Sequence, residues 1–204
     1  MKKVEFLLSE VEIQKLKGIV ERKINNIKIN VAGILEKKEG CNLNWGLLFC
    51  LICEGMENIV IYNEPIKIFN REDFPKLKVV YESEYPGDFD HHLNLTDNFK
   101  EALGEKWVEE KVNTIEVIND KIKWLGGNDE WYLNIDVGVL ISLYNGYKIF
   151  VVLRHSSAGI MEIYYGLNFS WIMKRENIEE LYFIDPKEII YINRSKMDIT
   201  DIVR

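Results

Sequence analysis

The feature that most constrains the fold is the dipeptide Asn145-Gly146, which separates two long runs of strand-forming residues. Asn-Gly between such runs is the strongest short-range signal for a β-hairpin, because both residues tolerate the positive φ of a two-residue turn. The runs belong to the stretch from Trp131 to Gly166, which is rich in Val, Ile, Leu and Tyr. The sequence therefore predicts a long antiparallel hairpin here, and with it a sheet.

The turn also predicts which residues of the two strands face each other. A two-residue turn places Tyr144 opposite Tyr147, and the pairing then proceeds outward one residue at a time. Asp136 is then expected opposite His155 at the open end of the hairpin, with Ser157 on the same face.

The Asp136–His155 pair is the candidate catalytic site. A carboxylate beside an imidazole orients its tautomer and stabilises its charged form, as a general base requires. A structural role fits the same residues, since buried polar groups at strand ends commonly satisfy one another. Ser157 would lie roughly 6–7 Å along the strand from His155, too far for direct proton transfer. A bulge at Gly138 would change the register and separate the pair.

Helices are predicted at two further places. Ser9 and Glu12 form a capping box, and apolar residues then recur at helical spacing: Ile13, Leu16, Val20, Ile24 and Ile27. Thr96 and Asp97 are caps for a second helix near 96–111. Together with strands expected at 29–36, 45–53, 59–62, 160–165 and 189–192, the class is α+β with a mostly antiparallel sheet.

A chain of 204 residues buries a substantial core as one domain, so a single domain over 1–204 is expected. Asn119-Asp120 predicts a turn between two strands within 114–124, and the tail predicts a strand at 168–173 and a helix at 176–183. The segment of about 63–95 is less regular and holds three of the four prolines. A long irregular stretch in a compact domain is more often functional or mobile than a missed strand.

That segment contains the candidate metal site, formed by Asp88, Asp90 and His91. These side chains offer oxygen and nitrogen ligands for a divalent cation, although their spacing matches no zinc or calcium motif and a solvated loop is the alternative. Cys50 and Cys53 match a CxxC pair but lie within an apolar strand, where residues three apart point to opposite faces. We expect reduced thiols in the core, and the sequence predicts no cofactor.

The net charge of −7 argues against a nucleic-acid partner and is compatible with a basic protein partner. No apolar stretch reaches the roughly 18–20 residues that span a bilayer. The N-terminus turns acidic before an apolar signal-peptide region forms, so we expect a cytoplasmic protein with no membrane partner. The abundance of Ile, Lys, Asn and Glu is typical of an AT-rich bacterial genome.

Three aromatic residues, Trp124, Trp131 and Tyr164, are candidate interface anchors, since Trp and Tyr dominate binding hot spots; the alternative places them in the core. No catalytic fingerprint is present in the sequence. We therefore expect a protein that acts by protein binding or inhibition rather than by catalysis. In composition and charge alone, the chain is similar to the acidic single-domain immunity proteins that bacteria keep beside toxins. Two alternatives stay open: a hydrolase or metal-dependent enzyme using Asp136/His155 or the Asp88–His92 loop, and a homo-oligomeric structural or assembly subunit.

Overall fold

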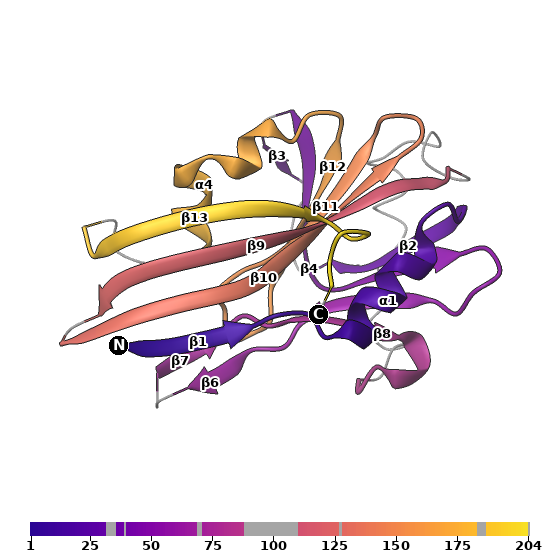
Figure 1. Ribbon diagram of the computed structural model, residues 1–204. Helices are drawn as coiled ribbons and strands as arrows, with labels where there is room; N and C mark the ends of the chain where they lie inside the picture. The colour runs from indigo at the N-terminus through magenta and orange to yellow at the C-terminus, as the bar shows by residue number, and fades with distance from the viewer. Residues whose placement is uncertain are drawn as a thin grey trace.

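The computed structural model describes residues 1–31, 36–38, 40–68, 71–87, 110–126, 128–182 and 187–203. Within these ranges the fold is α+β and is dominated by one mostly antiparallel sheet (Figure 1). The strands of that sheet are β1 (Lys2–Phe6), β2 (Ile24–Val31), β3 (Glu36–Lys38), β4 (Cys41–Cys53), β5 (Ile59–Asn63), β8 (Leu77–Tyr81), β9 (Val112–Gly126), β10 (Asp129–Leu143), β11 (Lys148–Leu153), β12 (Met161–Gly166) and β13 (Ile189–Asp198). A separate small hairpin is formed by β6 (Ile66–Ile68) and β7 (Arg71–Phe74). The helices are α1 (Glu10–Ile19) and α4 (Arg175–Tyr182), with the 3-10 turns η1 (Glu82–Glu84) and η3 (Ser170–Met173).

The strand order along the sheet is β13-β9-β10-β11-β12-β4-β5-β8, so β13 and β8 are its two end strands. The N-terminal strand β1 lies off this order and pairs in parallel with β10, with Lys2 opposite Trp131 and Phe6 opposite Ile135, while β2 and β3 pair with β4. The sequence pattern predicts no strand at the residues of β1. In Figure 1, β13, β9, β10 and β1 lie side by side as a broad ribbon.

The predicted hairpin is present as β10 and β11, but its register is shifted by one residue. Ile141 pairs with Ile149, and Leu143 donates its N–H to the Tyr147 carbonyl at 2.8 Å. The connection is therefore a three-residue loop in which Gly146 takes a φ of 87°, the usual bulged alternative to a two-residue turn. The predicted pairing of Asp136 with His155 is wrong for this reason.

The capping box is confirmed: the Ser9 side chain accepts the Glu12 N–H, and the Glu12 carboxylate accepts the Ser9 N–H. The predicted extension of the helix to Ile27 is wrong, because α1 ends at Ile19 and Ile24 opens β2. A register shift between Ile24 and Asn26 lets Ile24 and Ile27 both reach the core from the same strand, which mimics helical spacing in the sequence.

Three other predictions are corrected. β9 runs unbroken through Asn119-Asp120, because both side chains are buried and bonded instead of forming a turn. The described part of the 63–95 segment is largely regular and contains β6, β7, β8 and η1. The predicted strand at 168–173 is the turn η3. The predicted helix near 96–111 falls mainly outside the described residues, and β9 begins directly after it at Val112.

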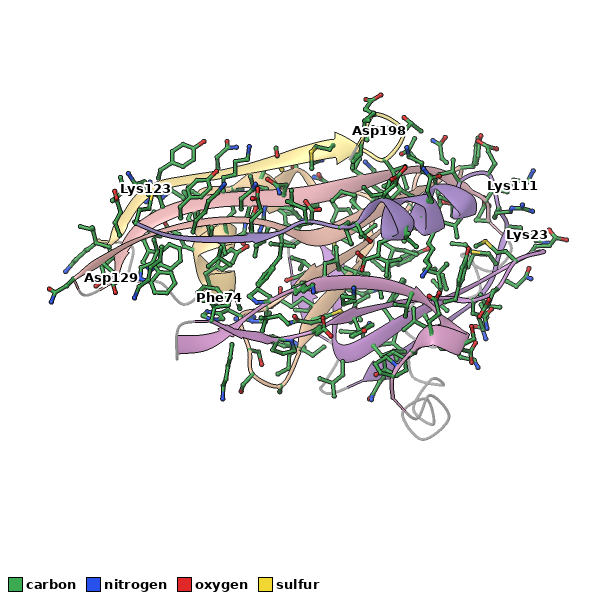
Figure 2. All side chains as sticks on the ribbon, turned by 60° about the horizontal axis from the view of Figure 1, so that its bottom comes forward. Lys23, Phe74, Lys111, Lys123, Asp129 and Asp198 are labelled. Atoms are coloured by element: carbon green, nitrogen blue, oxygen red, sulfur yellow. The ribbon has the colours of Figure 1, made fainter. Side chains whose placement is uncertain are left out.

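The two larger buried clusters lie on opposite faces of the sheet. The first packs beneath α1 and includes Leu16, Val139 and Ile141. The second packs beneath η3, α4 and β7, and it includes Phe74 of β7, which Figure 2 labels. The Phe74 and Trp131 ring centroids are 5.9 Å apart. Val137 belongs to the second cluster and Val139 to the first, since a bulge between Asp136 and Gly138 exchanges the two faces of β10.

Candidate functional site

Asp136 is fully buried and acts as a structural acceptor. One carboxylate oxygen accepts the Leu8 N–H at 2.8 Å, and the other accepts the Asn119 side-chain amide at 3.0 Å. Leu8 follows β1, so Asp136 fixes the chain between β1 and α1 across a separation of 128 residues. Buried carboxylates of this kind are stabilised by such charge-assisted bonds.

His155 lies on the other face of the sheet from Asp136. Its Nδ1 is 3.1 Å from the Tyr182 carbonyl, and its ring stacks on Phe74 with a centroid distance of 5.6 Å. Phe74 and Tyr182 belong to the second cluster, whereas Leu8 belongs to the first. The structure therefore does not assemble the predicted catalytic pair, and Ser157 is exposed in a turn beyond β11.

The candidate metal residues Asp88, Asp90 and His91 lie outside the described residues. Across the described part of the chain, no group of three or more His, Cys, Asp or Glu is placed to hold a metal ion. In the same part, no helix is both long enough and apolar enough to cross a bilayer.

The two cysteines of the CxxC pair point to opposite faces of β4, as predicted. Cys53 belongs to the first cluster, whereas Cys50 packs in a small third cluster with Leu48 and Val60. Burial raises the pKa of Cys50 to about 12 and that of Cys53 to about 11, so both are protonated thiols at neutral pH.

Trp124, Trp131 and Tyr164 are buried in the second cluster and are not exposed anchors in the single chain. Trp124 stacks on Trp131 at 5.7 Å, and the Tyr164 hydroxyl donates to Glu162 at 2.6 Å. The aromatic residue that stands out on the sheet surface is Tyr191 of β13, which is 49% exposed. Tyr191 lies within the strand predicted at 189–192, but simple alternation does not single it out, because the register shift between Ile189 and Tyr191 leaves its neighbour Ile190 exposed as well.

A buried ion pair attaches β13 to its inner neighbour β9. The Arg194 guanidinium donates two bonds to Asp120, both at 2.6 Å, and the Tyr182 hydroxyl donates to the same carboxylate at 2.7 Å. Burial by itself lowers the pKa of Arg194, but the Asp120 charge outweighs it and raises that pKa above its ordinary value. Arg194 also donates to the Ile172 carbonyl at 3.0 Å, which connects β13 to η3.

The end of the sheet at β8 is covered. Glu12 of α1 accepts the Val79 N–H at 3.3 Å, and Glu84 of η1 accepts the Tyr81 N–H at 2.9 Å. Lys15 of α1 pairs with Glu84 as well. Carboxylates from two neighbouring elements therefore satisfy backbone donors of β8.

The other end of the sheet, at β13, is open. Its inner edge pairs with β9 from Ile189 to Asp198, and no described residue pairs with its outer edge. Ile190 and Tyr191 are 52% and 49% exposed on this strand. An uncovered edge presents unpaired N–H and C=O groups to any extended chain that meets it.

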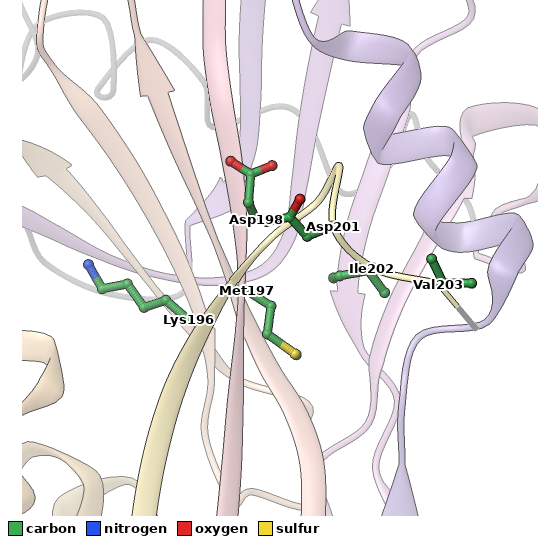
Figure 3. A pocket seen from close by; sticks show the side chains of 6 residues that line it. All are labelled: Lys196, Met197, Asp198, Asp201, Ile202 and Val203. Atoms are coloured by element: carbon green, nitrogen blue, oxygen red, sulfur yellow. The ribbon is translucent and has the colours of Figure 1, made fainter.

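A cavity of about 400 Å³ lies where β13 ends (Figure 3). It is lined by Lys196, Met197, Asp198, Asp201, Ile202 and Val203. Figure 3 shows Met197 and Ile202 lying between β13 and the returning chain, with Asp198 and Asp201 at one rim. Asp198 accepts two bonds from Thr200, which lower the pKa of its carboxyl and keep it charged. The lining therefore combines apolar side chains with two carboxylates and one ammonium group, that of Lys196, whose Nζ lies 3.9 Å from a Glu116 carboxylate oxygen outside the cavity. Acidic groups exceed basic ones in the lining by one.

Comparisons with protein-family models, with curated proteins and with solved structures found no significant match.

Proposed function

We propose that this protein acts by binding, and thereby inhibiting, a basic protein partner. The observation that carries the proposal is the placement of its charge. The buried ionisable side chains of the described residues are nearly balanced, with four acidic (Glu12, Asp120, Asp136 and Glu162) and three basic (Lys15, Arg154 and Arg194). The net charge of −7 therefore resides almost wholly outside this buried set, where it attracts and orients a positively charged surface.

The geometry gives the hydrolase alternative no support through Asp136 and His155, since their side chains lie on opposite faces of the sheet. A homo-oligomeric subunit would need anchors other than Trp124, Trp131 and Tyr164, which are occupied within the chain. Binding through the acidic surface requires neither a catalytic group nor these aromatic residues, so it remains the function best supported.

The proposal is tested by affinity capture with the full chain from cells of its source, followed by identification of the retained proteins. We expect one retained protein of high isoelectric point, released when salt is raised from about 0.1 M to about 0.5 M, because salt screens exposed charge pairs. Any activity of the captured protein is then assayed alone and with an equimolar amount of this chain, and we expect the activity to fall.

Retention of no basic protein would overturn the proposal. So would a captured protein whose activity is the same with and without this chain.

A further inference from the structure

We propose that the outer edge of β13 and the cavity at its end form one docking site for an extended segment of a basic protein, with a Lys or Arg side chain held in the cavity. This inference rests on the proposed function and names the site and the chemistry of its partner. Strand addition at a sheet edge is a recurrent recognition mode, in which backbone bonds provide affinity and pockets for alternate side chains provide specificity.

The first support is the contrast between the two end strands. Carboxylates of Glu12 and Glu84 occupy backbone donors of β8, and α1 lies alongside. β13 is ten residues long, and α4 and η3 contact it, but no described residue forms a backbone hydrogen bond with its outer edge. Proteins commonly protect long edge strands, so an uncovered one held rigidly by the Arg194–Asp120 pair is suited to receive another strand.

The second support is the direction in which an added strand would place its side chains. Residues directly opposite in paired strands project to the same face of the sheet. Met197 lines the cavity, so the residue of an added strand opposite Met197 projects on the cavity side. Side chains on the same face of the added strand are two residues apart. The neighbours of that residue on the cavity side therefore lie opposite Ser195 in one direction and beyond the end of β13 in the other.

The third support is the match between the cavity and a basic side chain. Lys and Arg combine a long aliphatic stem with a charged head, and they bury the stem while the head stays at a polar rim. Met197 and Ile202 supply apolar contact for the stem, and Asp198 and Asp201 supply negative charge for the head. Arg is moreover among the residues most enriched in binding hot spots.

The test uses the full chain and a synthetic peptide of alternating Thr and Val with one central Arg, together with a second peptide in which Glu replaces that Arg. Binding is measured by fluorescence anisotropy, and amide hydrogen exchange reports which strand becomes protected. We expect the Arg peptide to slow exchange across β13 and to bind more tightly than the Glu peptide.

Two variants of equal net charge test whether the charged group of the peptide's Arg binds at the rim of the cavity. Asp198→Asn/Asp201→Asn removes the charge at the rim, whereas Glu54→Gln/Glu176→Gln removes the same charge at exposed positions elsewhere. We expect the rim variant to weaken binding of the Arg peptide about fivefold and the control variant to leave it unchanged. Asp201→Asn alone serves as a second test, because it leaves the Asp198–Thr200 bonds in place.

The inference is overturned if β13 gains no protection, if the two peptides bind alike, or if the rim and control variants behave alike. A basic protein that is captured equally by the wild type and the rim variant, and leaves β13 exchange unchanged, would uphold the proposed function while overturning this site. Binding of the Arg peptide at β13 without any captured basic protein would uphold the site and overturn the proposed function.

Discussion

The two end strands of the sheet, β8 and β13, differ in what contacts their outer backbone groups. At β8, a buried carboxylate from α1 and a second from η1 accept backbone N–H groups, and Lys78 and Lys15 balance their charge. At β13, the inner side is fixed by the buried Arg194–Asp120 pair, and no strand among the described residues pairs with the outer side, where Ile190 and Tyr191 are about half exposed. One end is covered by the protein itself, and the other is firmly anchored yet unoccupied.

The difference shows that a strand can be firmly attached to its sheet and still have backbone groups free to pair with another chain. β13 is attached through its antiparallel pairing with β9 and through the buried Arg194 side chain, so the backbone groups on its outer edge take no part in that attachment. β8 uses its own backbone donors to bind α1 and η1, which leaves those donors unavailable to another chain. Substitutions at three places test this contrast: the anchor of β13, the covered end at β8 and the open edge of β13.

The largest effect is expected when the anchor of β13 is broken. Arg194→Met leaves the Asp120 charge buried and unpaired, which should lower the free energy of unfolding by about 3–5 kcal/mol in a urea titration. The control is the double variant Arg194→Met/Asp120→Asn, which removes both charges and should recover part of the loss. A double variant less stable than the single one would show that the buried charge is not the cause.

A smaller effect is expected when the covered end is weakened. Glu12→Gln removes the charge that accepts bonds from Ser9 and Val79, and it should cost about 1–2 kcal/mol at pH 7. Burial by itself raises the pKa of Glu12, but bonds from Ser9, Lys78 and Val79 outweigh it and hold the pKa below its ordinary value of 4.5.

The sign of the pH dependence follows from that lowered pKa. The contribution of the Glu12 charge is present above pH 4.5, and it is lost as pH falls through the folded-state value. The stability difference between wild type and Glu12→Gln should therefore narrow in acid. A difference that is constant from pH 7 to pH 3 would contradict the assignment.

The smallest effect is expected on the open edge. Ile190 and Tyr191 are about half exposed, so Ile190→Thr and Tyr191→Thr should change the free energy of unfolding by less than about 0.5 kcal/mol. Thr retains the β-branched character that suits a strand. Thermal unfolding of each variant beside wild type provides the measurement, and a loss comparable to that of Glu12→Gln would show that these side chains pack more than their exposure indicates.

The candidate sites were less predictable than the fold because their chemistry depends on distant partners. Asp136 looked like half of a catalytic pair, yet its partners are the Leu8 N–H and the Asn119 amide, brought to it by the parallel strand β1 and by β9. The sequence pattern predicted a turn at Asp120, but its carboxylate is buried and paired with the guanidinium of Arg194, 74 residues further along the chain. Local composition carries no signal for either bond.

The sequence by itself determined the α+β class, the hairpin at Asn145-Gly146, the start of α1 and the opposite orientation of Cys50 and Cys53. Each of these follows from interactions within a few residues: turn conformation, capping and the alternation of side chains along a strand. Only the tertiary structure decided the one-residue shift of the hairpin, the burial of Asp136 and the choice of which sheet end stays open. These depend on a bulged loop and on contacts between segments far apart in the chain, where packing and hydrogen bonding select among patterns that the local sequence allows equally.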